Sequence, residues 1–313
     1  MIRRSSWLPI LAAAGCALTA AAVWVAVTAS SQVEMLDAAA DHGFIGLRRP
    51  SLAPIATAVA RSVNPVPLVI AAIVLMGIAI VRGRIRVAAA VAVILIGANL
   101  TTQVLKPLLA HPRFAEWLGH AQINGASWPS GHSTAAMAIA LCAVLVAPAR
   151  LRPAVAALGA VFAVAIAYSL VAMGWHWPAD VLGGFLVAAT WTLLAVAALR
   201  EADLRWAAGT GREKAARLRD ALTPPAVAAA GALGVVALLV ALKPHAVLGY
   251  MAEHPAALTG AVAIAALGTV LATGLALVLK REPGATQSRR STVPSGHSPS
   301  RRSALAARPP ERR

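Results

Sequence analysis

Long apolar blocks without internal charge dominate the sequence and restrict its fold more than any other feature. Eight blocks are candidates for membrane spans: 7–31, 63–81, 87–105, 132–149, 154–173, 179–199, 223–242 and 256–279. A helix needs about 20 mostly apolar residues to cross a bilayer. Because a backbone in lipid must satisfy its own hydrogen bonds, each block is expected to be a helix. The sequence therefore predicts an all-α fold, a polytopic membrane helix bundle.

The composition agrees with a membrane protein. Of the 313 residues, 59% are hydrophobic and 13% are charged, whereas a soluble domain carries about 25% charged residues. Cys16 and Cys142 lie inside apolar blocks, where we expect small packing residues and no disulfide. Arg3 and Arg4 precede the first block as they would in a signal peptide, but the block is longer than a typical signal core. We therefore expect a retained helix.

The net charge of +16 is concentrated in alternate loops. The Arg-rich segments are 1–4, 82–86, 149–152, 200–221 and the tail after Lys280. Nucleic-acid binding is the usual interpretation of so basic a chain, but the eight spans place all these segments on one side. Since cytoplasmic loops carry an excess of Lys and Arg, both termini are expected in the cytoplasm, with membrane lipids and no nucleic acid as partners. The longer outer loop 32–62 is a candidate for an amphipathic helix at the interface.

These patterns divide the chain into four parts. We predict a six-helix membrane core at 1–200, a basic cytoplasmic linker at 201–221, two additional transmembrane helices within 222–280 and a disordered basic tail at 281–313. The tail lacks apolar periodicity; attraction to anionic lipid and a charge run that fixes the topology are equally good interpretations of it. For the two added helices, domain fusion, association into a homo-oligomer and simple anchoring all stay open.

The predicted topology gathers polar residues at the outer ends of the helices. Near the third, fourth and sixth spans these are Lys106, Arg113, Ser130, Gly131, His132, His176 and Asp180. Lys and Arg suit phosphate oxygens, and the free amides at a helix start attract an anion. Asp180, one turn after His176, can hold one ring nitrogen as a donor and leave the other free to attack. Such a group is suited to phosphoryl transfer.

Simpler interpretations exist for each of these residues taken alone. Lys106 can be a snorkelling anchor at a helix end, His132 a helix cap, and His176 with Asp180 an interfacial capping pair. Metal binding is the main rival for the His and Asp residues. The outer loops hold no Cys and few carboxylates, and Lys106 and Arg113 would repel a divalent ion, so we expect no metal and no other cofactor.

Three spaced motifs resemble those of the type 2 phosphatidic acid phosphatase family, membrane relatives of the vanadium-dependent haloperoxidases. They are KPLLAHPRF at 106–114, PSGH at 129–132 and SLVAMGWHWPAD at 169–180, all within the first 200 residues. The resemblance implies a lipid phosphatase that uses no metal. Its phosphate ligands would be Lys106, Arg113, Ser130 and Gly131. It also implies that His132 protonates the leaving group, that His176 is the nucleophile and that Asp180 orients it.

Two positions depart from the family pattern. Phe114 replaces a Pro, which concerns the shape of the loop, and Leu170 replaces an Arg that binds phosphate in the family. Loss of one such donor costs about 2.7–4 kcal/mol of transition-state stabilisation. His111 and His120 are candidate substitutes for it. A second PSGH, at 294–297, lies in the tail with no span after it, so we expect no catalytic role there.

Together these patterns predict a lipid phosphate or diphosphate phosphatase in a bacterial plasma membrane. Its active site would face outside, and its substrate would be a phosphorylated lipid such as phosphatidic acid, phosphatidylglycerol phosphate or polyprenyl diphosphate. The bacterial origin is inferred from the bias of the chain toward Ala and Arg. The alternative is a weakened relative that binds phosphorylated lipids without turning them over, because Leu170 supplies no charge.

Overall fold

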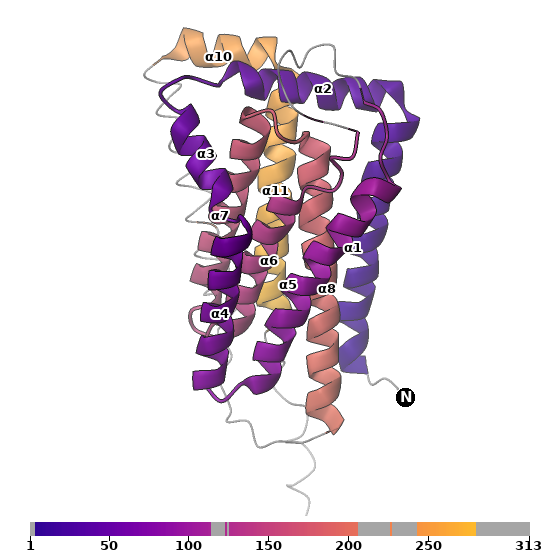
Figure 1. Cartoon of the computed structure of the whole chain (residues 1–313), viewed down its shortest axis with the longest axis vertical. Helices are drawn as coiled ribbons and strands as arrows, with labels where there is room; N and C mark the ends of the chain where they lie inside the picture. Colours follow the sequence, from indigo (N-terminus) through magenta and orange to yellow (C-terminus); the bar gives the residue numbers. More distant parts are fainter. Residues whose placement is uncertain (1–3, 114–122, 124, 206–225, 227–242, 280–313) are drawn as a thin grey trace, which may run out of the picture. The chain divides into compact units, whose positions relative to one another are not determined.

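The computed structural model describes residues 4–113, 123, 125–205, 226 and 243–279, and all regular structure in these residues is α-helical. The helices are α1 (Arg4–Ala29), α2 (Ser31–Gly46), α3 (Ala53–Arg61), α4 (Pro65–Val81), α5 (Ile85–Leu108), α6 (Gly131–Val146), α7 (Arg152–Ala172), α8 (Pro178–Arg205), α10 (Pro244–Glu253) and α11 (Pro255–Val278). The predicted all-α helix bundle is confirmed (Figure 1). The tail predicted at 281–313 lies outside the described residues.

Seven of the eight predicted spans coincide with helices of the structure. Five stretches are individually long and apolar enough to cross a membrane: Trp7–Ala29, Ile85–Leu108, Arg152–Ala172, Pro178–Asp203 and Pro255–Val278. The span predicted at 63–81 belongs to a bent pair, α3 and α4, whose axes differ by 51° at a short break. The span at 132–149 is the shorter apolar helix α6, of 16 residues. The span at 223–242 lies outside the described residues, apart from Ala226.

Helix α6 packs against more of the bundle than most of its neighbours. It contacts α4, α5, α7, α8 and α11, and nearly all of its residues from Ser133 to Val146 are buried. Small residues permit this close packing. Gly159 of α7 meets Ala140, and a Cβ added to that glycine would lie 3.0 Å from the Cβ of the alanine. Close contact between small residues is a common way for helices to associate in lipid.

Helix α11 is packed into the same compact unit as the predicted core. It contacts α2, α6, α7 and α8, and the compact unit extends to Lys280. Helix α8 also continues past the predicted core boundary at residue 200 and ends at Arg205. The division of the chain at residue 200 stays a prediction, while the packing shows that α11 buries part of α6 and α8.

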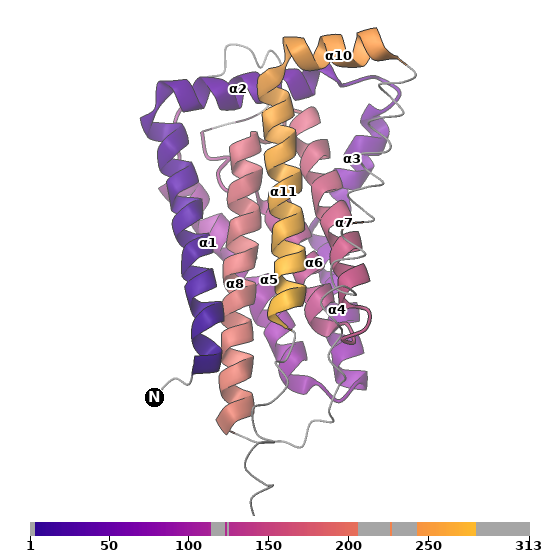
Figure 2. The same cartoon turned by 180° about the vertical axis from the view of Figure 1, so that it is seen from behind.

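Helix α2 lies crosswise over the end of the bundle at which α8 begins (Figures 1 and 2). Ser30 caps it, since the side chain of this serine accepts a hydrogen bond from the amide of Val33. The loop 32–62 therefore contains helical structure, as expected, while its place at the outer membrane interface stays a prediction. Two of the three acidic residues of α2 are buried, since Asp37 and Asp41 are 9% and 0% exposed. This end of the molecule is called the α2 end below.

Candidate functional site

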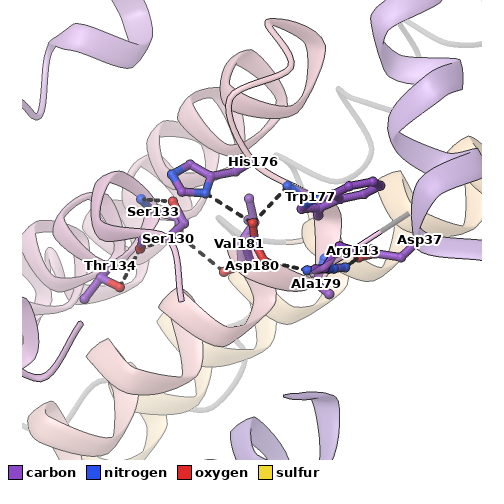
Figure 3. Close-up of polar contacts among 10 residues, drawn as sticks. All are labelled: Asp37, Arg113, Ser130, Ser133, Thr134, His176, Trp177, Ala179, Asp180 and Val181. Carbon is purple, nitrogen blue, oxygen red and sulfur yellow. Dashed lines mark hydrogen bonds and ion pairs between the residues drawn. The ribbon is translucent and has the colours of Figure 1, made fainter. Parts of the chain in front are cut away.

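The structure brings the predicted site residues to the α2 end, on three helices and the segments beside them. Lys106 lies in the last turn of α5, Arg113 follows that helix, Ser130 caps α6, Gly131 and His132 begin α6, His176 precedes α8, and Asp180 lies in the first turn of α8. Figure 3 shows four of them, Arg113, Ser130, His176 and Asp180, with their hydrogen bonds. Their side chains meet because α5, α6 and α8 pack against one another.

Hydrogen bonds of Ser130 fix the start of α6 to the start of α8. The Ser130 amide donates to the backbone oxygen of Asp180 at 2.9 Å, and the Ser130 hydroxyl oxygen accepts from the amide of Ser133 at 3.3 Å. Gly184 of α8 permits this approach, because a Cβ there would lie only 2.6 Å from the Ser130 backbone oxygen. Ser130 is fully buried. It therefore acts as a helix cap that positions the first amides of α6.

Polar side chains of α5 converge on the backbone at Gly131. A Cβ added to Gly131 would lie 3.9 Å from Nζ of Lys106, 3.6 Å from Nε2 of Gln103 and 3.9 Å from Oγ1 of Thr102. The first amides of a helix have no partners within it and attract anions. An ammonium and an amide beside the start of α6 therefore suit a phosphate oxygen. Gln103 was not predicted, although its spacing from Lys106 indicates a shared helix face.

Asp180 connects three groups of the site (Figure 3). Its Oδ2 lies 3.3 Å from Nδ1 of His176 and accepts from the amide of Trp177 at 3.1 Å, while its Oδ1 accepts from Nη1 of Arg113 at 2.9 Å. The carboxylate is fully buried. A carboxylate beside Nδ1 favours the proton on that nitrogen, which leaves the lone pair of Nε2 of His176 available. The predicted pairing of His176 with Asp180 is present in the structure.

Arg113 is held by two carboxylates. Its Nη1 pairs with Asp180 and its Nη2 with Asp37 of α2, and its side chain is only 5% exposed. The guanidinium also lies over the ring of Trp177, 4.7 Å from the ring centroid. Both ends of the guanidinium fork are thus occupied by protein groups. The predicted role of Arg113 as a phosphate ligand stays a prediction, and the structure adds a second role, which is to neutralise two buried carboxylates.

Asp37 and Asp41 form an acidic pair that sequence reasoning missed. They lie one turn apart on α2, and Oδ1 of Asp37 also accepts from the amide of Ala179 at 3.0 Å. Burial raises the pKa of Asp37 from 3.8 to about 6, against the opposing charge of Arg113. Burial, reinforced by the negative charges of Asp37 and Asp180, raises the pKa of Asp41 to about 8. Within the described residues, neither oxygen of Asp41 has a hydrogen-bond partner.

The raised pKa of Asp41 predicts a stability that falls with pH. The folded chain keeps this carboxyl protonated up to about pH 8, whereas the unfolded chain ionises it near 3.8. Its favourable contribution is therefore complete below about pH 4 and is lost as the pH rises toward 8. We expect Asp41→Asn to melt at a higher temperature than the native chain at pH 8.5, with the difference shrinking toward pH 5.

Glu253→Gln is the matched control for Asp41→Asn, because Glu253 is an exposed carboxylate on α10. Thermal melts of the purified chain in one detergent, at intervals between pH 5 and 8.5, measure the effect. A melting difference between Asp41→Asn and the native chain that does not vary with pH would contradict the prediction.

His132 has a partner from a distant part of the chain. Its Nε2 lies 3.0 Å from Oδ1 of Asn64, the residue that precedes α4 at the bend between α3 and α4. The ring of Trp175 is 6.2 Å from the ring of His132. Asn64 was not predicted, because no local pattern connects it with the PSGH motif. It marks the side of the site toward which Nε2 of His132 is directed.

Leu170, the residue in place of the family's Arg, is fully buried. It belongs to the same apolar cluster as Met137 of α6 and Phe185 of α8. The side chain at position 170 therefore packs in the apolar core and supplies no charge to the site. Of the two candidate substitutes, His111 has a buried Nδ1 with no partner among the described residues. His120 and Phe114 lie outside the described residues.

Within the described residues, no group of three or more His, Cys, Asp or Glu side chains is arranged to hold a metal ion. The expectation of a metal-free site stays a prediction. The arrangement itself offers a nucleophilic imidazole, a second imidazole, an ammonium and a helix start. These groups can perform phosphoryl transfer through a covalent intermediate.

Residues 87–203, from the start of α5 almost to the end of α8, match the family model described as the PAP2 superfamily. This segment of the chain belongs to the PAP2 superfamily. The predicted resemblance to type 2 phosphatidic acid phosphatases is thereby confirmed. All three motifs, and with them all seven predicted site residues, lie inside the PAP2 segment.

One solved structure has a fold similar to that of this chain. The chain is similar to a protein described as the first transmembrane PAP2 type phosphatidylglycerolphosphate phosphatase from Bacillus subtilis, with a TM-score of 0.50 and 21% sequence identity. The match covers 60% of this chain and 96% of that chain. No curated protein matches the chain. Together with its apolar helices, this likeness of fold supports a multi-pass membrane protein.

Proposed function

We propose that the chain is a membrane lipid phosphatase that hydrolyses phosphate or diphosphate esters through a phosphohistidine on His176. One observation carries the proposal: the buried Asp180 lies against Nδ1 of His176, which leaves the other ring nitrogen of His176 free to attack. The start of α6, with Lys106 beside it, supplies the positive environment that a transferred phosphoryl group needs. The PAP2 segment supports this chemistry.

The proposed reaction has two balanced steps. Nε2 of His176 attacks phosphorus, the bond from phosphorus to the leaving oxygen breaks, and His132 gives its proton to that oxygen. A water molecule then attacks the phosphohistidine, His132 takes the proton of the water, and the P–N bond breaks with its electron pair returning to His176. Inorganic phosphate and the dephosphorylated lipid are the products. Lys106 and the amides of α6 stabilise the charge on the phosphoryl oxygens in both steps.

The proposal includes a location and an orientation. The chain would reside in a bacterial plasma membrane with both termini in the cytoplasm. The α2 end, which contains the site, would then face outside. The charge distribution of the loops supports this orientation. Phosphorylated lipids of the outer leaflet would be the substrates.

A second candidate function is binding without turnover, favoured by Leu170. A screen of phosphate release from phosphatidic acid, phosphatidylglycerol phosphate and polyprenyl diphosphate separates the two functions. We expect the native chain to release phosphate from at least one of them. If the native chain is inert and Leu170→Arg gains the roughly 10²–10³-fold that one such donor is worth, the binding function is correct. Leu170→Met is the control, and a melt of each variant is needed because Leu170 is fully buried.

A further inference from the structure

An open groove of about 590 Å³ lies between α3 and the segment that follows α7. This volume is within the usual range for small-molecule sites. Two arginines flank an otherwise mostly apolar lining, formed by Arg48, Pro54, Thr57, Ala58, Arg61 and Met173. The Thr57 hydroxyl lies 3.9 Å from the sulfur of Met173, a contact that connects the two sides of the groove. The groove therefore combines a surface suited to lipid chains with two positive charges.

Two short stretches of chain connect this groove to the two histidines of the site. Arg61 is three residues before Asn64, whose side chain contacts His132. Met173 is three residues before His176. Three residues span roughly 10 Å at most, so the groove begins close to both imidazoles. Because Asn64 lies on the Nε2 side of His132, the groove is on the side from which a proton would pass to the leaving group.

The charges of the groove are available for an anion. Both guanidinium groups are exposed, and within the described residues neither has a carboxylate partner. Arg113, by contrast, already pairs through both of its terminal nitrogens with Asp37 and Asp180, and within the described residues only its Nε has no partner. An Arg fork binds phosphate oxygens by paired, charge-assisted hydrogen bonds. Arg48 and Arg61 are therefore available to bind an anionic group of the substrate on this side of the site.

We infer that this α3 groove binds a second phosphate of the substrate, located in the leaving group, an inference that rests on the proposed function. Phosphatidylglycerol phosphate and polyprenyl diphosphate both leave a lipid that retains a phosphate. Phosphatidic acid leaves a neutral diacylglycerol. The chain accordingly selects lipid phosphates with an anionic leaving group, and Arg61 is the main determinant of this selectivity because it lies nearest to Asn64 in the chain.

The test compares kcat/KM of the purified full-length chain for phosphatidylglycerol phosphate and for phosphatidic acid with the same acyl chains, in phosphatidylcholine vesicles. We expect Arg61→Gln to lower the ratio of the two values by about tenfold, the usual contribution of a hydrogen bond to a charged group. Arg48→Gln lowers the ratio in the same direction. Arg49→Gln is the matched control. This substitution removes one positive charge from the same loop, but Arg49 does not line the groove. An unchanged ratio in Arg61→Gln overturns the inference.

A binding measurement separates this inference from the proposed function. The dissociation constants of the two lipids are compared for His176→Ala and for the double variant with Arg61→Gln, which needs no turnover. The inference is supported if the preference for phosphatidylglycerol phosphate disappears with Arg61→Gln. This result would support a phosphate site in the groove even if the native chain releases no phosphate. Phosphatidylserine that competes as strongly as phosphatidylglycerol phosphate would show a general site for anionic lipid and overturn the inference.

Discussion

Replacing His176 by Ala is expected to abolish phosphate release, with a fall in kcat of about 10⁴-fold or more, the size of loss seen when a catalytic nucleophile is removed. The physical reason is that, in the proposed mechanism, His176 supplies the atom that bonds to phosphorus, and no other imidazole lies against Asp180 in the described residues. Phosphate release from a lipid substrate, measured on the purified chain, gives the effect directly. Activity within tenfold of the native value would exclude His176 as the nucleophile.

The matched control for His176→Ala is His245→Ala, because His245 is an exposed histidine on α10. We expect this control to keep its activity and its melting temperature. Quenching the native chain with alkaline detergent during turnover of a substrate labelled with radioactive phosphorus should trap a phosphohistidine, which is stable in base and labile in acid, and which His176→Ala lacks. A label that persists in His176→Ala would place the covalent step on another residue.

His132 can be separated from His176 by the choice of leaving group. A nitrophenyl phosphate needs little protonation when its bond to phosphorus breaks, so loss of a general acid affects it less than an alkyl phosphate. If the proposed mechanism is correct, His132→Ala should therefore retain part of the rate of the first step with the aryl ester and lose that rate with the lipid. Equal losses with both esters would argue against His132 as the acid.

Local patterns predicted much of the fold and part of the site. The apolar blocks predicted helices because the hydropathy of a segment can be evaluated without knowing the rest of the chain. Seven of the eight blocks coincide with helices. The pairing of His176 with Asp180 was also predictable from a local pattern, since Asp180 in the first turn of α8 can reach back to a residue just before that helix. The serine cap of α6 follows from the PSGH motif for the same reason.

Contacts between distant segments were beyond the reach of such patterns. Asp37 meets Arg113 across 76 residues, and Asn64 meets His132 across 68. Neither contact has a sequence signature, because each depends on how α2 and the α3–α4 bend fold back over the bundle. An amphipathic helix at the interface was expected in the loop 32–62, and within this loop Asp41 of α2 is fully buried. A helix was predictable in this loop. The direction of its acidic residues was not, because it depends on the distant cation Arg113, which pairs with Asp37.

Arg113→Gln is expected to destabilise the chain strongly even when no phosphate is present. The substitution leaves Asp37 and Asp180 buried without their cation. Removing one partner of a buried ion pair typically costs about 3–5 kcal/mol. We therefore expect a large drop in the melting temperature of the purified chain in phosphate-free buffer. If Arg113 served only as a phosphate ligand, the melting temperature in that buffer would be unchanged and only KM would rise.

A double-mutant cycle with Asp37→Asn isolates the contribution of the pair. Because the double variant carries one buried charge fewer than Arg113→Gln alone, it should recover part of the lost stability. Asp37→Asn by itself should cost less than Arg113→Gln, since Arg113 keeps Asp180 as a partner and Asp37 is the more easily neutralised carboxyl, with a pKa of about 6. Additive losses in the double variant would mean that the two residues do not interact, and Arg113 would then be free to bind the phosphate of the substrate.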